Sequence, residues 1–185
     1  LTRTSCLPST TRLPFGSSCV TTAATFVTTA SERLTDPLPS LDAVESALDA
    51  WVPADAPAGL GQAMRYGVLD GGKRLRPLLV LAAAQAVDGE REAALRAACA
   101  VELIHAYSLV HDDMPCMDND VLRRGKPTVH VKYGEAGALL AGDALQALAF
   151  ELLTPENDQV PEAVQARLCR LLAHAAGSAG MAGGQ

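Results

Sequence analysis

The chain has 185 residues, of which 49% are apolar, 4% are aromatic and 19% are charged. This length and apolar content suffice for one domain with a hydrophobic core. The net charge of −6 and the sequence pI of about 5.1 exclude a general basic surface for nucleic acid. Alanine and leucine dominate and aromatic residues are scarce, which predicts an all-α fold.

The first forty residues differ in composition from the rest of the chain. Serine and threonine number sixteen in residues 1–40 and five in residues 41–185. The first segment is also poor in acidic residues and lacks periodic apolar spacing, which predicts disorder up to a boundary near 35–40. Two origins are open: an organelle transit peptide, which this composition resembles, or non-native sequence translated upstream of the true start. The leucine at position 1 favours the second origin.

From residue 41 onward, apolar residues recur at helical spacing. Those from Leu41 to Trp51 share one face of a helix that ends before Pro53. A second segment is apolar nearly all round, which predicts a helix buried in a larger bundle, with Pro77 tolerated in its first turn. No segment has the alternating pattern of a strand. The predicted helices span 41–51, 78–87, 93–110, 137–153 and 161–176.

The cysteines and the longest apolar runs bear on the cellular compartment. Five cysteines, an odd number with no Cys-x-x-Cys pair, indicate reduced thiols in a cytosolic protein. The longest uninterrupted apolar runs, 77–84 and 136–141, are much shorter than a membrane span. We therefore expect a cytoplasmic protein without a membrane span. The cysteines are Cys6, Cys19, Cys99, Cys116 and Cys169.

The most informative segment is HDDMPCMDNDVLRRG, which runs from His111 to Gly125. Carboxylates at this density repel one another unless cations bind among them. They suit Mg²⁺, which typically bridges a few carboxylates to substrate phosphates, and the adjacent arginines suit phosphate. The alternative is a solvated acidic loop followed by a basic turn. The charged residues are Asp112, Asp113, Asp118, Asp120, Arg123 and Arg124.

Helical geometry predicts which of these acids face one another. His105 and Asp112 are seven residues apart and therefore share one helix face. Pro115 should end the helix and let Asp118 fold back towards Asp112. Asp113 points about 100° away, which favours a supporting role over direct metal binding. His105 by itself is equally consistent with a packed helix histidine.

A second cationic segment, GVLDGGKRLRP, carries Lys73, Arg74 and Arg76 after two glycines. Its spacing approaches that of a P-loop. However, an arginine replaces the serine or threonine that binds Mg²⁺ and no strand precedes the segment, which excludes a nucleoside triphosphatase. The three cations would approach a polyanion, and the alternative is an exposed basic turn.

The acidic segment is not a calcium loop. From Asp118 onward, the positions that require glycine and glutamate hold Arg123 and Val129, which excludes an EF-hand. Together the two segments describe a carboxylate wall that binds metal and a separate basic wall that does not. This arrangement suits two anionic substrates, one held through Mg²⁺ and one by direct ion pairs.

Four motifs occur in order along the chain: GGKRLRP at 71–77, DDMPCMD at 112–118, LRRGKPT at 122–128 and LAGDALQ at 140–146. Together they resemble the motifs of the trans-polyprenyl diphosphate synthases, and in particular the bacterial farnesyl diphosphate synthases. The resemblance covers 41–185 and leaves 1–40 outside it. It implies an all-α isoprenoid synthase bundle and a homodimer.

The resemblance also implies the reaction and the site. An allylic diphosphate, dimethylallyl or geranyl, would condense with isopentenyl diphosphate in the presence of Mg²⁺. The diphosphate leaves first, the isopentenyl double bond attacks, and a proton is then lost to the departing diphosphate. Asp112 and Asp118 match the metal ligands, and Arg123 matches the residue that binds the allylic diphosphate. The residues that match the isopentenyl diphosphate site are Lys73, Arg76, His105 and Arg124.

Product length in this family depends on bulk beneath the first aspartate-rich motif. Tyr107 stands five residues before Asp112, more than one helical turn deeper. An aromatic plug there, together with the spacer between the aspartates, resembles a farnesyl rather than a geranylgeranyl synthase. A longer polyprenyl product, with Tyr107 serving only as core packing, is the alternative.

The chain departs from the family pattern at its end. It stops at GMAGGQ, 180–185, and contains neither the family's second aspartate-rich motif nor its Lys-Thr pair. The resemblance therefore implies that 41–185 is the N-terminal part of a synthase domain, with little or no activity alone. An inactive diphosphate-binding fragment is the non-enzymatic alternative. An isoprenoid cyclase is disfavoured because it would not need the basic wall.

Overall fold

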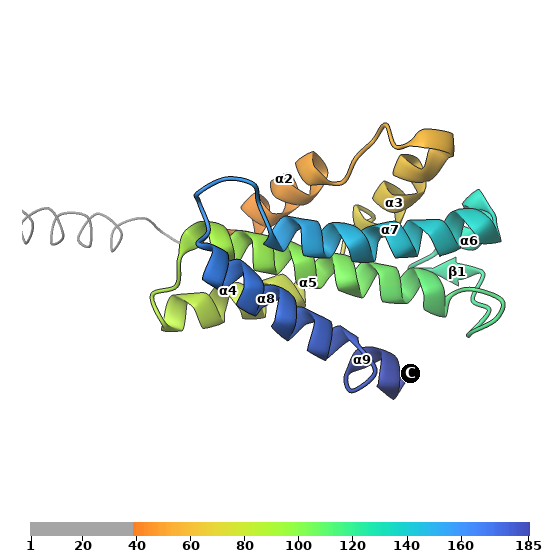
Figure 1. The fold of residues 1–185 in the computed structure, drawn as a ribbon. Coiled ribbons are helices and arrows are strands. Elements are labelled where there is room, and N and C mark those ends of the chain that lie inside the picture. The colour runs from red at the N-terminus through yellow and green to blue at the C-terminus, as the bar shows by residue number, and fades with distance from the viewer. Residues whose placement is uncertain (1–38) are drawn as a thin grey trace, which may run out of the picture. The chain divides into compact units, whose positions relative to one another are not determined.

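The computed structural model describes residues 39–185, and within them nearly all regular structure is helical (Figure 1). The all-α prediction is thereby confirmed. The prediction of a disordered or non-native segment at 1–40 falls almost entirely outside the described residues. The helices are α2 (Leu41–Trp51), α3 (Leu60–Val68), α4 (Leu75–Ala86), α5 (Arg91–Asp112), α6 (Val129–Tyr133), α7 (Glu135–Leu153), α8 (Glu162–Ala176) and α9 (Met181–Gly184), with a 3₁₀ turn η1 at Pro57–Gly59.

The core is built around α5 and α7, the two longest helices, which lie side by side (Figure 1). Leu103 of α5 and Leu145 of α7 are fully buried. Small residues such as Ala98 and Ala141 are also fully buried, and they let the two helix backbones approach closely. The alanine-rich composition therefore serves packing as well as helix propensity.

The two helices nearest the start of the described chain cover one side of this core. Val44 and Leu48 of α2 and Met64 of α3 are buried against it. The hydroxyl of Ser40 accepts a hydrogen bond from the Ala43 amide at 3.2 Å and so caps the start of α2. This cap explains why the helix begins at residue 41, as the apolar spacing predicts.

The helix predicted at 78–87 differs from α4 in two respects. It begins earlier, at Leu75, although Pro77 lies in its first turn as predicted. The prediction that this helix is buried nearly all round is wrong for the described structure, because only Pro77 and Leu81 are buried. Leu79 is 62% exposed and Val87 is 76% exposed.

The sequence predicts no membrane span because its uninterrupted apolar runs are short. The structure contains helices that are longer than those runs and apolar on average. Among residues 39–185, α5 and α7 are long and apolar enough to span a bilayer by length and composition alone, each with a mean hydropathy of 1.4. The same two helices pack against each other at the centre of the bundle. Burial of this kind is typical of core helices in folded domains.

Six short elements were not predicted. They are η1, α3, α6, α9 and the two strands of a hairpin, β1 (Leu122–Arg123) and β2 (Lys126–Pro127). The prediction that no segment forms a strand is therefore wrong at 122–127. Arg124 and Gly125 form the turn with φ values of 53° and 78°, and two positive values in succession match the backbone twist of paired strands.

Candidate active site

Three of the predicted site residues, His105, Arg123 and Arg124, line one cleft beside the second half of α5. The loop before α4, the hairpin and Asp113 at the end of α5 enclose it, whereas Lys73, Arg76, Asp112 and Asp118 do not line it. Its lining includes His105 of α5, Asp70 and Gly71 of the loop, and Arg123 and Arg124 of the hairpin. Residues more than fifty positions apart in the sequence are thereby brought together.

The hairpin sends its two arginines to different partners. Arg123 binds Asp113 through two nitrogens: Nε donates to Oδ2 at 2.9 Å and Nη2 donates to Oδ1 at 2.6 Å. Arg124 donates from Nη1 to the carbonyl of Gly71 in the loop before α4. Arg123 ends strand β1, whereas Arg124 is the first residue of the turn and has a φ of 53°, so the backbone changes direction between the two side chains.

Asp113 is a buried anchor for Arg123. It is 3% exposed, and the bidentate ion pair compensates its burial. Asp113 lines the cleft with both carboxylate oxygens engaged by Arg123, whereas Asp112 does not line it, and the supporting role of Asp113 stays a prediction. The sequence did not indicate its partner, because Arg123 was assigned only to the allylic diphosphate.

The loop after α5 folds back on itself, as the position of Pro115 predicts. The backbone amide of Asp118 donates to the carbonyl of Asp112 at 2.9 Å, and that of Asn119 donates to the carbonyl of Met114 at 3.0 Å. Partial burial and then the nearby carboxylate of Asp118 raise the pKa of Asp112. The two carboxylates are thus close enough to repel each other.

This pair fits Mg²⁺ better than a metal that needs an all-protein site. Within 39–185, no group of three or more histidine, cysteine, aspartate or glutamate side chains is arranged to hold a metal ion. Mg²⁺ commonly uses one or two carboxylates and completes its shell with water and substrate phosphates. One oxygen of Asp112 also accepts a hydrogen bond from Gln185 Nε2 at 2.7 Å, a contact that the sequence did not predict.

His105 is half-buried and lines the cleft together with Arg123 and Arg124. Burial first, and then the charges of Arg76, Arg124 and Arg123, lower the pKa of His105. A neutral imidazole beside several guanidinium groups can donate a hydrogen bond to an anion without adding further positive charge. His105 shares this cleft with Arg124, and its place near the isopentenyl diphosphate stays a prediction.

The three cations of the basic segment at 71–77 differ in exposure. Lys73 and Arg76 are exposed, whereas Arg74 is only 6% exposed and is paired with Glu45 and Glu102. The prediction of three cations that approach one polyanion is therefore wrong for Arg74. Arg74 and Glu102 both line the cleft, but the head group of Arg74 is already paired with Glu45 and Glu102.

Tyr107 lies in a second, mainly apolar cavity next to Asp112. Leu139 of α7 and Met181 of α9 also line this cavity. The ring of Tyr107 packs edge-on against that of His111, with centroids 5.7 Å apart. An apolar cavity that opens beside Asp112 is the setting that the chain-length hypothesis requires.

His111 joins α5 to α7 and is a contact that sequence reasoning missed. Its Nε2 lies 3.0 Å from the carbonyl oxygen of Leu139. A Cβ at Gly142 would lie 2.5 Å from Cδ2 and 2.8 Å from Cε1 of the ring. The glycine in LAGDALQ therefore makes room for the histidine that immediately precedes Asp112.

The described chain is an all-α bundle in which acidic and basic side chains lie at one end of a core helix. The model of the polyprenyl synthetase family matches residues 57–185, and the chain belongs to that family. This finding confirms the resemblance drawn from the four motifs.

Known members of the family include both farnesyl and geranylgeranyl diphosphate synthases. The chain is 51% identical over 145 residues to farnesyl diphosphate synthase of Geobacillus stearothermophilus, covering 77% of this chain and 49% of the relative. It is 50% identical over 144 residues to geranylgeranyl pyrophosphate synthase 4 of Arabidopsis thaliana, covering 78% and 38%. The chain thus spans about half or less of the length of these relatives.

A solved structure shares the fold. The apo FPP/GFPP synthase of Zymomonas mobilis superposes with a TM-score of 0.72 at 47% identity, covering 88% of this chain and 56% of that one. A geranyltransferase of Legionella pneumophila gives a TM-score of 0.69 at 36% identity, covering 90% and 54%. The described helices therefore follow the arrangement found in these transferases.

Proposed function

We propose that the protein is a prenyltransferase that condenses an allylic diphosphate with isopentenyl diphosphate, with Mg²⁺ as cofactor and farnesyl diphosphate as product. The observation that carries this proposal is the division of charge at the end of α5. Arg123 pairs with Asp113, which follows Asp112 in the chain, whereas Arg124 donates to Gly71 in the loop that carries Lys73. Two adjoining anionic substrates could be held in this way.

The residues would have distinct tasks. Asp112 and Asp118 would hold Mg²⁺, which when bound would neutralise the departing diphosphate. Arg123 would contact the allylic diphosphate, and its ion pair with the buried Asp113 would fix its direction. The side chains that would hold isopentenyl diphosphate are Lys73, Arg76, His105 and Arg124.

The apolar cavity lined by Tyr107 supports the farnesyl product. An aromatic side chain in the path of a growing hydrocarbon would stop elongation by steric exclusion. The second candidate is a geranylgeranyl or other longer polyprenyl diphosphate, because the Arabidopsis thaliana relatives with that product are 49–52% identical to this chain. The identity of the product chain distinguishes the two.

We also propose a cytoplasmic homodimer. The resemblance implies the dimer, and exposed apolar side chains such as Leu79 of α4 and Leu140 of α7 are available for a further contact. The three cysteines in the described part, Cys99, Cys116 and Cys169, are free, which is typical of a reducing compartment. Analytical ultracentrifugation of the purified chain tests the dimer, because a single monomer boundary at micromolar concentration would contradict it.

The test of the proposed reaction uses the purified whole chain. It is mixed with dimethylallyl diphosphate, radiolabelled isopentenyl diphosphate and Mg²⁺, and the dephosphorylated products are separated by chromatography. Calorimetric titration of the allylic diphosphate, run in parallel, should show binding that depends on Mg²⁺. The chromatographed product should be farnesyl. The variant Asp112→Asn/Asp118→Asn is the control and should lose both signals.

The same experiment separates the enzymatic and non-enzymatic alternatives. Binding of both diphosphates without release of pyrophosphate would favour a diphosphate-binding protein that lacks catalysis. Failure to bind the allylic diphosphate in the presence of Mg²⁺ would contradict the proposed function altogether.

A further inference from the structure

Arg74 lies in the chain between the two exposed cations of the basic loop but points away from them. Its side chain is 5% exposed. Its backbone has a φ of 43°, a left-handed value that is uncommon outside glycine, and it provides the N-cap of α4. An arginine in this backbone conformation with a buried head group requires strong partners elsewhere.

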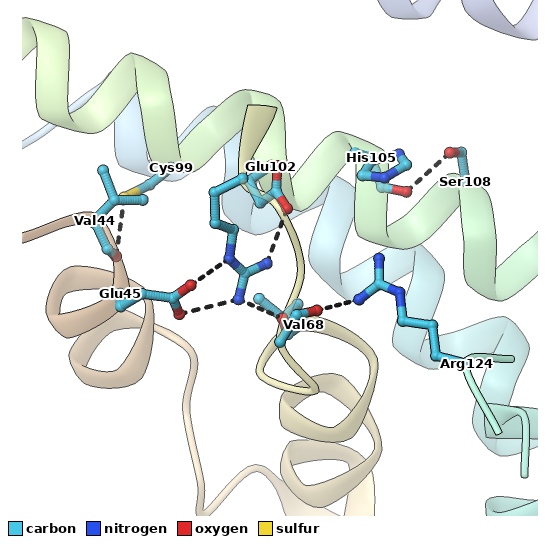
Figure 2. Close-up of polar contacts among 10 residues, drawn as sticks. Val44, Glu45, Val68, Cys99, Glu102, His105, Ser108 and Arg124 are labelled. Atoms are coloured by element: carbon cyan, nitrogen blue, oxygen red, sulfur yellow. Dashed lines mark hydrogen bonds and ion pairs between the residues drawn. The ribbon is translucent and has the colours of Figure 1, made fainter. Parts of the chain in front are cut away.

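Those partners come from three different helices (Figure 2). Nε and Nη2 of Arg74 donate to the two carboxylate oxygens of Glu45 in α2, at 2.6 and 3.0 Å. Nη1 donates to Glu102 of α5 at 2.8 Å, and Nη2 also donates to the carbonyl of Val68, the last residue of α3, at 2.9 Å. All three guanidinium nitrogens are therefore occupied.

The geometry of this cluster matters more than its charge. A buried ion pair contributes little net stability, because the desolvation of both partners offsets their attraction. A planar guanidinium, however, can bind one carboxylate with two nitrogens and still reach a second carboxylate and a carbonyl, which a lysine ammonium cannot do from one position. The cluster therefore fixes where the loop begins and how α4 departs from it.

The cluster also connects the loop to the rest of the cleft. Glu102 lies one turn before His105 on α5, and Val68 precedes the loop whose Asp70 and Gly71 bind the hairpin. A shift of the Arg74 head group would therefore displace the loop relative to the helix that carries the imidazole.

We propose that Arg74 is a positioning residue that holds Lys73 and Arg76 in place for isopentenyl diphosphate, acting through Glu45, Glu102 and the carbonyl of Val68. The inference rests on the proposed function, because it assigns a task to the isopentenyl side of that site. We assign Arg74 no contact with substrate, although its side chain lines the cleft, because each of its three guanidinium nitrogens is already paired with a protein oxygen. The allylic diphosphate, held on the other side of the hairpin, is not affected by this residue.

The test compares Arg74→Lys with a matched control, Arg96→Lys, in the whole chain. Arg96 is a second arginine with low exposure, and it pairs with Glu92 at 2.7 Å and with the carbonyl of Leu152 at 3.2 Å. It lies nine residues before His105, roughly 14 Å along the helix axis. Both variants keep a positive charge and lose the guanidinium fork.

Two readouts separate positioning from a general loss of stability. The dissociation constant for isopentenyl diphosphate, measured by calorimetry, should rise about tenfold or more in Arg74→Lys and stay within about twofold in Arg96→Lys. Affinity for dimethylallyl diphosphate with Mg²⁺ should stay within about twofold in both variants. Amide hydrogen exchange in residues 70–78 should accelerate only in Arg74→Lys.

Glu102→Gln provides a second variant should Arg74→Lys fail to fold. The amide keeps the shape and one hydrogen bond, so the same exchange and affinity changes should follow in weaker form. Equal behaviour of the Arg74 and Arg96 variants, or unchanged exchange at 70–78, would overturn the inference. The exchange measurement needs no ligand, so it tests the anchoring of the loop by Arg74 on its own. Failure of the wild-type chain to bind either diphosphate would contradict the proposed function instead.

Discussion

Replacement of Gly142 with alanine would drive a methyl group into the ring of His111. The added Cβ would lie 2.5 Å from Cδ2 and 2.8 Å from Cε1, so the imidazole must leave its place between α5 and α7. It would then lose its contact with the Leu139 carbonyl and its edge-on packing against Tyr107. The substitution therefore tests the contact that holds the end of α5 next to the carboxylate pair.

The cost follows from these contacts. A hydrogen bond contributes about 1 kcal/mol, an aromatic pair about 1 kcal/mol, and overpacking of a helix contact about 2 kcal/mol. The higher helix propensity of alanine returns about 1 kcal/mol. Together these terms predict a loss of about 3 kcal/mol in the free energy of unfolding, or about 10 °C in melting temperature for a domain of this size.

The assay is urea denaturation followed by circular dichroism, with Gly137→Ala as the matched control. Gly137 lies on the same helix, and a Cβ there would meet only Cβ of Tyr133, at 3.3 Å. We expect the control to change stability by less than about 1 kcal/mol. A double variant, His111→Ala/Gly142→Ala, should be no less stable than His111→Ala alone, since the clash is gone. Strict additivity of the two substitutions, or a stable Gly142→Ala, would refute the reasoning.

Three further predictions concern single side chains. Burial and nearby arginines lower the pKa of His105, so the unfolded chain binds more protons than the folded chain near pH 6. The free energy of unfolding should therefore fall as the pH drops below about 6.5. Urea titrations from pH 7.5 to 5 should show a smaller fall in His105→Gln. Tyr107→Ala in an active enzyme should lengthen the prenyl chain of the product, which chromatography measures. An unchanged chain length would contradict the hypothesis that Tyr107 limits elongation. Burial raises the pKa of Cys99 to about 12, so iodoacetamide should label exposed Cys116 well before Cys99 in peptide mapping by mass spectrometry; faster labelling of Cys99 would contradict its burial.

The long helices were predictable because their signal is local. Leu103 and Leu145 lie in segments whose alanine and leucine content favours helix and whose apolar residues specify the core. The hairpin was missed because each of its strands has only two residues and depends on the positive φ values of Arg124 and Gly125. Such a backbone choice leaves no periodic pattern in the sequence.

The residue types of the site were predictable from the sequence, whereas the directions in which their side chains point were not. Lys73, Arg74 and Arg76 look equivalent in sequence, yet Arg74 is buried. Its partners Glu45 and Glu102 are 29 and 28 residues away on other helices, so local spacing does not reveal them. Gly142 and His111 are likewise distant in the chain. Spacing within one helix identifies residues on a common face, whereas partners across the fold require tertiary structure.

Calorimetric titration of dimethylallyl diphosphate into the whole chain, with and without Mg²⁺, shows whether Asp112 and Asp118 hold the metal that binds the allylic substrate. We expect binding that requires Mg²⁺ and disappears in Asp112→Asn/Asp118→Asn, while isopentenyl diphosphate still binds that variant without metal. Binding of the allylic diphosphate that is independent of Mg²⁺, or that is unchanged in the double variant, would contradict the assignment of these aspartates and with it the proposed prenyl transfer.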